Sequence, residues 1–63
     1  MKVTVNHKEH EIKQDTTVRE LLTMLGYGTA VVFINDRKLR MDEYDGTLNE
    51  NDLIKIIRIL GGG

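Results

Sequence analysis

Only one segment of this chain has the periodicity of a helix, and this restricts the folds that are open to it. Within residues 15–26, DTTVRELLTMLG, apolar side chains recur at i, i+3, i+4 and i+7, which places them on one side of a helix of about two turns. They are Val18, Leu21, Leu22 and Leu25. Thr17 and Glu20 fit a capping box at the start of this helix, and Gly26 is the residue type that ends a helix in the left-handed conformation.

The rest of the chain has the patterns of strands and turns. Before the helix, residues 2–6 alternate polar and apolar side chains and predict a strand. Residues 6–9 (NHKE) then predict a turn, and residues 10–14 (HEIKQ) predict a short strand that supplies only Ile12 to the core. After the helix, the sequence predicts a central strand at 30–35, a tight turn at Asn35 and Asp36, a short edge strand at 37–40, a turn at 49–52 and a last strand at 53–60.

A helix that is apolar on one side needs a sheet to cover, and a single helix covers only one face of that sheet. We therefore expect an α+β fold in which a mixed sheet of four to five strands carries one main helix. In the last strand, the period of two puts Ile54 and Ile56 beneath the helix and turns Ile57 and Ile59 to the open face. Exposed single aliphatic residues are common, so this pair either contacts a partner or is simply exposed.

Composition excludes several classes of function. The 63 residues include no cysteine and no serine, which removes disulfides, thiolate ligands and the usual nucleophiles. A formal net charge of −1 argues against nucleic acid as a partner, and no apolar run approaches the ~20 residues of a membrane span. The first residues lack the pattern of a signal peptide. We expect a cytoplasmic protein that is a monomer on its own and has no nucleic-acid or membrane partner.

Two local features are weak candidates for sites. His7 and His10 could at most form a weak metal site, because no cysteine accompanies them, and they are more simply solvated residues of a hairpin. Residues 41–52 carry five carboxylates and no basic residue, with Tyr44 and Leu48 as the expected anchors. This segment is either a solvated flank or a docking surface for a basic partner. A solvated loop gives its carboxylates no reason to differ in pKa as acid–base catalysis requires.

The sequence ends on Gly61, Gly62 and Gly63. Such an end can be a linker remnant or a frayed terminus. It also has a chemical interpretation, because glycines let a chain extend through a channel that any Cβ would block. The terminal carboxylate, with an ordinary pKa of about 3.3–3.7, is ionised near neutral pH. It can attack an activated phosphate, but it is a poor acyl electrophile until it is adenylated. This tail is suited to being processed in another protein's active site.

These features together resemble the ubiquitin-like β-grasp sulfur carriers, and most of all the ThiS family of thiamine biosynthesis. The resemblance rests on the helix TTVRELLTMLG, the strand and turn VVFIND, the DEY segment, the NEND turn followed by LIKIIRIL, and the terminal glycines. It implies a β-grasp domain over residues 1–60 with a flexible glycine tail at 61–63. The MoaD-type carriers of molybdopterin synthesis share this fold and tail but are usually longer.

The resemblance implies a carrier protein that is not itself an enzyme and binds no cofactor. A ThiF-like adenylating enzyme would use ATP and Mg²⁺ to adenylate the carboxylate of Gly63. A persulfide sulfur donor would convert it to a thiocarboxylate, and a ThiG-like thiazole synthase would take the sulfur. We expect partners to contact the residues before the tail, which are Ile57, Arg58, Ile59 and Leu60. The alternatives are a carrier for molybdopterin synthesis and a ubiquitin-like protein modifier or interaction module.

Overall fold

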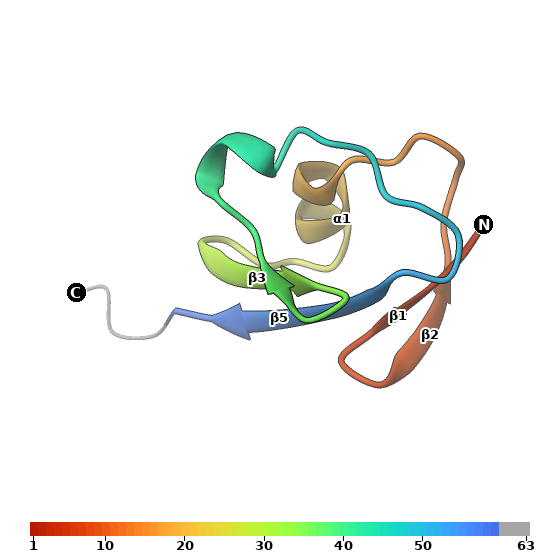
Figure 1. The fold of residues 1–63 in the computed structure, drawn as a ribbon, viewed down its shortest axis with the longest axis horizontal. Coiled ribbons are helices and arrows are strands. Elements are labelled where there is room, and N and C mark those ends of the chain that lie inside the picture. The colour runs from red at the N-terminus through yellow and green to blue at the C-terminus, as the bar shows by residue number, and fades with distance from the viewer. Residues whose placement is uncertain (60–63) are drawn as a thin grey trace.

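The computed structural model describes residues 1–59, in which one α-helix packs on one face of a five-stranded sheet (Figure 1). This is the α+β, ubiquitin-like β-grasp arrangement that the sequence predicts. The boundary expected after residue 60 and the glycine tail lie outside the described residues. The elements are β1 (Lys2–Val5), β2 (Lys8–Glu11), α1 (Val18–Met24), β3 (Ala30–Ile34), β4 (Arg37–Lys38), the short 3₁₀ helix η1 (Met41–Glu43) and β5 (Leu53–Arg58).

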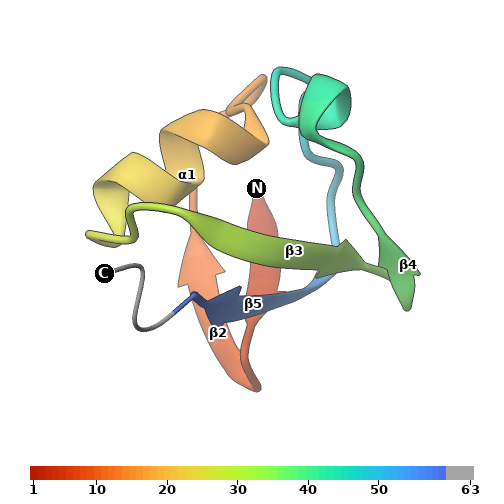
Figure 2. The ribbon, with the colours of Figure 1, turned by 90° about the vertical axis from the view of Figure 1, so that its left-hand side faces the viewer.

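The last strand lies in the middle of the sheet. The strand order is β2-β1-β5-β3-β4, so β5 inserts between the β1–β2 and β3–β4 hairpins. It runs parallel to β1, where Val5 pairs with Ile54, and antiparallel to β3, where Ile34 also pairs with Ile54. Because β1 pairs with the start of β5 and β3 pairs with it from Ile54 to Arg58, β5 lies inside the sheet and not at an edge (Figure 2).

Helix α1 begins and ends at the residues that the sequence indicates. The Thr17 hydroxyl accepts a hydrogen bond from the Glu20 backbone N–H at 3.1 Å, and a Glu20 carboxylate oxygen accepts one from the Thr17 N–H at 2.9 Å. This reciprocal pair is the expected capping box. Leu25 caps the other end, and Gly26 follows it with φ of 80°, the left-handed conformation in which glycine carries no Cβ penalty.

The core lies between α1 and the sheet face that it covers. Val32 and Val3 are fully buried in the sheet, and Leu21 of the helix is 1% exposed. Ile54 and Ile56 point toward the helix as expected, whereas Leu25 is only partly buried. The remaining buried apolar residues are Val5, Ile12, Val18, Leu22, Ala30, Leu39 and Leu48.

Several strand boundaries differ from the sequence-based expectation; β4, for example, ends at Lys38 instead of residue 40, and β2 ends at Glu11 instead of residue 14. The first turn consists of Asn6 and His7 alone, with φ of 48° and 72°, so β2 begins at Lys8 instead of at residue 10. Two successive left-handed residues match the twist of a hairpin, and asparagine and histidine adopt this conformation more readily than most residues. At the other end of the chain, β5 ends at Arg58. Ile59 keeps one hydrogen bond, from its N–H to Thr29 O at 3.4 Å.

Candidate functional site

The expected contact residues Ile57, Arg58 and Ile59 lie at the end of β5, and we call them the tail root. Leu60 and the three glycines lie outside the described residues. Ile57 and Ile59 are 44% and 49% exposed, which confirms that they turn to the open face of the sheet. The exposed Arg58 lies on the opposite face, the one that α1 covers. A partner that surrounds the tail root therefore meets an apolar surface on one side and a cation on the other.

The open face is apolar around the tail root. Ile57 pairs across the strands with Val31, and Lys55 pairs with Phe33, so these side chains project from the same face. Val31 and Phe33 are half-buried, and Leu53 at the start of β5 is 60% exposed. No helix of the described chain covers this face, because α1 and η1 both lie on the other side of the sheet (Figure 2). The result is an exposed sheet face with several apolar side chains on β3 and β5, interrupted by Lys55, that is available to a partner.

Asn6 holds β5 after β1 has turned away. The β1–β5 ladder contains only two residue pairs, but the Asn6 side chain extends it. Its Oδ1 accepts a hydrogen bond from the Ile56 N–H at 2.9 Å, and its Nδ2 donates to the Ile56 carbonyl at 3.2 Å. On the other side, Arg58 pairs with Ala30 of β3. Strand β5 is thus held on the β1 side as far as Ile56, just before the tail root, and on the β3 side as far as Arg58.

Tyr27 supports Arg58 from beneath. The guanidinium carbon of Arg58 lies 5.0 Å from the centroid of the Tyr27 ring, within the range of a cation–π interaction. The tyrosine hydroxyl accepts a hydrogen bond from Asn6 Nδ2 at 3.4 Å, and the Tyr27 N–H donates to Leu22 O at 2.9 Å. Sequence reasoning missed Asn6 and Tyr27 because their partners are distant in the chain. An asparagine where a strand ends in a left-handed turn was the only available signal.

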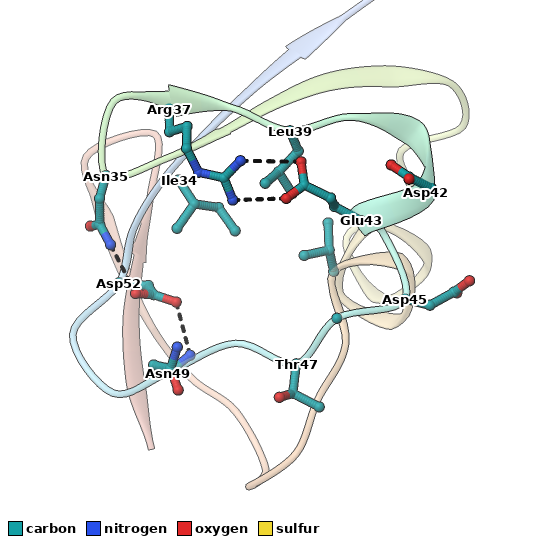
Figure 3. A pocket seen from close by; sticks show the side chains of 12 residues that line it. Ile34, Asn35, Arg37, Leu39, Asp42, Glu43, Asp45, Thr47, Asn49 and Asp52 are labelled. Carbon is teal, nitrogen blue, oxygen red and sulfur yellow. Dashed lines mark hydrogen bonds and ion pairs between the residues drawn. The ribbon is translucent and has the colours of Figure 1, made fainter.

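The acidic segment lines a polar pocket beside β3 and β4 and is held there by ion pairs and hydrogen bonds (Figure 3). Arg37 of β4 makes two contacts with the Glu43 carboxylate, at 3.1 and 3.0 Å. Asp52 is 7% exposed, so the expectation of a solvated flank is wrong for this residue. Its carboxylate accepts hydrogen bonds from Asn35 Nδ2 at 3.1 Å and from the Asn49 N–H at 2.8 Å.

The Glu43 carboxylate in this pocket is unsuited to act as a general acid. The hydrogen bond from Arg37 lowers the pKa of Glu43, and the Arg40 backbone N–H contributes in the same direction. A general acid at neutral pH needs a raised pKa instead. The two expected anchors have structural roles, since Leu48 is buried and the Tyr44 hydroxyl donates to Ala30 O at 2.8 Å. The residues of this pocket therefore attach the loop to β3 and β4, and this structural role accounts for their arrangement.

Neither histidine lies in a group of side chains that could bind a metal ion within the described residues. Within residues 1–59, no group of three or more histidine or acidic side chains is placed to hold a metal ion. His7 lies in the first turn, and His10 pairs with Val3 in the sheet. Nor is any helix in this part of the chain long and apolar enough to cross a bilayer.

A β-grasp sheet with one apolar open face, and with a central last strand that leads to C-terminal glycines, defines the class of small ubiquitin-like domains. Within this class the chain belongs to the ThiS family, whose sequence model matches residues 2–63. The resemblance recognised from the sequence is thereby confirmed. Among curated protein sequences, no significant match to the chain was found.

Solved structures agree with this assignment. The crystal structure of the thiamine biosynthesis protein ThiS from Geobacter metallireducens is 28% identical, with a TM-score of 0.81 and 100% of each chain covered. The NMR solution structure of a thiamine biosynthesis protein from the same organism is also 28% identical. Its TM-score is 0.79, and the match covers 100% of this chain and 88% of that one.

Proposed function

We propose that this chain is a sulfur carrier protein of thiamine biosynthesis and that the carboxylate of Gly63 carries the sulfur. Membership of the ThiS family is the observation that carries the proposal, and the two solved thiamine biosynthesis proteins support it. The central position of β5 adds a physical reason. A tail that follows a strand paired with β3 as far as Arg58 has a fixed starting point, so the glycines can enter a partner's active site while the domain docks beside it.

The chemistry proceeds on the terminal carboxylate in a ThiF-like adenylating enzyme, which supplies the ATP and Mg²⁺ site. A carboxylate oxygen attacks the α-phosphorus of ATP, pyrophosphate leaves, and an acyl adenylate forms. A persulfide sulfur then attacks the acyl carbon and displaces AMP. A second thiol then attacks the donor's sulfur atom in the resulting S–S bond and forms a disulfide with the donor. This oxidation supplies the two electrons that cleave the S–S bond, and a thiocarboxylate is left on Gly63. A ThiG-like thiazole synthase accepts this sulfur. The proposal includes a location in the cytoplasm together with these partner enzymes.

The residues of this chain bind and orient, and the chemistry belongs to the partner. Ile57 and Ile59 offer the apolar surface on which the activating enzyme docks, because exposed apolar side chains beside a functional tail are a typical contact site. Gly61 and Gly62 supply a stretch without side chains that passes through a narrow channel. Leu60 joins the two parts.

Intact-mass spectrometry tests the proposal. Incubation with a cognate ThiF-like enzyme, ATP, Mg²⁺ and a persulfide donor should raise the mass of the chain by about 16 Da, the difference between sulfur and oxygen. Omission of ATP and deletion of Gly62 and Gly63 are the controls, and both should abolish the shift. An unchanged mass in a reaction that modifies a known carrier would overturn the proposal. Adducts on lysines of other proteins would indicate a protein modifier, and sulfur transfer to a molybdopterin synthase alone would indicate the other carrier pathway.

A further inference from the structure

Arg58 differs from the other three arginines of the chain in its surroundings. Each of those three forms an ion pair with a carboxylate, and the pairs are Arg19–Asp45 at 2.8 Å, Arg37–Glu43 at 3.0 Å and Arg40–Asp42 at 3.4 Å. Within residues 1–59, Arg58 has no carboxylate within ion-pair distance. Its contact is the face of Tyr27. Among the arginines, the charge at the tail root is therefore the one that the described domain does not neutralise.

The contact with Tyr27 positions Arg58 and leaves its hydrogen-bonding capacity free. The contact is between the charge and the ring face, so it does not occupy the five N–H donors of the guanidinium with acceptor oxygens. Tyr27 is half-buried and is held by its bonds to Asn6 and Leu22. Arg58 itself is exposed. A side chain that is already ordered loses less conformational entropy when a partner binds it.

The position of Arg58 along the chain decides what it can contact. It lies five residues before Gly63, and an extended chain of that length spans about 17 Å. The guanidinium is therefore too far from the terminal carboxylate to stabilise the phosphate of an acyl adenylate formed there. It belongs instead to the entrance of the channel that takes the tail, on the opposite side from Ile57 and Ile59.

We infer that Arg58, held over Tyr27, determines which activating enzyme accepts this chain by pairing with a carboxylate at the entrance of that enzyme's tail channel. The inference rests on the proposed function and names a specificity-determining contact for it. A carboxylate is the partner because it accepts two parallel hydrogen bonds from a guanidinium, and these pairs are strong where water is excluded. The apolar residues on the other side of the tail root supply that exclusion of water once the enzyme has docked.

ATP–pyrophosphate exchange, measured at increasing carrier concentration with the cognate ThiF-like enzyme, tests the inference. Arg58→Glu should raise the KM for the carrier about 100-fold, because it sets two carboxylates against each other in a desolvated contact, with kcat little changed. Arg58→Lys keeps the charge but loses the planar fork of N–H donors, so its KM should lie between that of the original protein and that of Arg58→Glu. Tyr27→Leu should raise KM by a few-fold, about the size of one cation–π contact, while Tyr27→Phe keeps the ring and should leave KM close to the original value.

Lys13→Glu is the matched control. It makes the same change of charge at an exposed position before the first residue of α1, whereas Tyr27 and Arg58 follow the last one. It therefore reports only the long-range effect of net charge. A KM for Arg58→Glu within two-fold of the original protein, or an equal rise for Lys13→Glu, would overturn the inference and leave the proposed function intact. If the unchanged protein is never adenylated, the inference and the proposed function are both wrong. Recovery of Arg58→Glu by an enzyme variant with a lysine or arginine at the channel entrance would identify the paired carboxylate.

Discussion

A single side chain, that of Asn6, replaces a missing length of strand beside β5. Parallel pairing with β1 stops at Val5 and Ile54. The next backbone N–H on the β1 side of β5, that of Ile56, still donates a hydrogen bond, which Asn6 Oδ1 accepts. Asparagine suits this position for two reasons. It adopts the left-handed conformation that Asn6 has, with φ of 48°, and its side chain offers a donor and an acceptor like those of the backbone.

Replacement of Asn6 tests this role. Asn6→Ala should lower the free energy of unfolding by about 2 kcal/mol, because it leaves the Ile56 N–H without its partner and forces alanine into a left-handed conformation. Asn6→Gly is the control that keeps the backbone free to adopt φ above zero, so its cost of about 1 kcal/mol isolates the hydrogen bonds. Urea unfolding measures both, and amide hydrogen exchange at Ile56 reports the lost bond. If Asn6→Gly is as stable as the original protein, the side-chain bonds contribute nothing.

At the scale of an element, α1 depends on its cap because it is short. Seven helical residues are too few to be stable by propensity alone. Thr17→Ala should therefore lower the free energy of unfolding by about 1 kcal/mol. Thr17→Ser retains the hydroxyl that accepts from the Glu20 N–H, so it should recover most of this loss in thermal or urea unfolding. Equal stability of the two variants would show that the hydroxyl is not the stabilising group.

The Arg37–Glu43 pair connects β4 to η1 and should make stability depend on pH. The pKa of Glu43 is lowered in the folded protein, so the folded state is favoured when this group is ionised. Its contribution is present above the ordinary glutamate pKa of about 4.3 and is lost as the pH falls through the lowered value. Urea midpoints measured from neutral to acidic pH should therefore converge for the original protein and Glu43→Gln below that range. Curves that stay parallel would contradict the role of this pair.

The elements that sequence predicted best are those with local signals. Helix α1 was found with its ends because Thr17, Glu20 and Gly26 adjoin the apolar stripe. The strand pattern likewise gave the exposed side of Ile57. The burial of Asp52 was not predictable, because it depends on Asn35, which lies 17 residues away. The support of Arg58 by Tyr27 also joins segments that nothing in the local sequence connects.

At the scale of the whole molecule, the two faces of the sheet have separate tasks. The face toward α1 forms the core, and the open face is available to a partner. Ile57→Asp should therefore change the free energy of unfolding by less than about 1 kcal/mol, since the side chain is 44% exposed. The same change should weaken binding to the activating enzyme about ten-fold or more, because it places a charge in an apolar contact.

Met41→Asp provides the matched comparison for Ile57→Asp. Met41 is 82% exposed on η1, on the other side of the molecule from the open face. Both variants replace an exposed apolar side chain by aspartate. Titration of the enzyme with each variant, followed by fluorescence anisotropy, should show weakened binding only for Ile57→Asp. Equal affinity of the two variants would remove the open face from the docking surface.

Folding and chemistry should be separable along the chain. Within residues 1–59, the buried core residues all lie between Val3 and Ile56, whereas the proposed reacting group belongs to Gly63. One alanine appended after Gly63 should therefore leave the urea midpoint unchanged, since every described core residue lies well before it in the chain. The same alanine should abolish the mass increase, because it places a Cβ at the reacting end and moves the carboxylate one residue, about 3.5 Å, further on. Normal thiocarboxylate formation by this variant would show that the enzyme does not measure the length of the tail. A lowered midpoint would show instead that the end of the chain contributes to the fold.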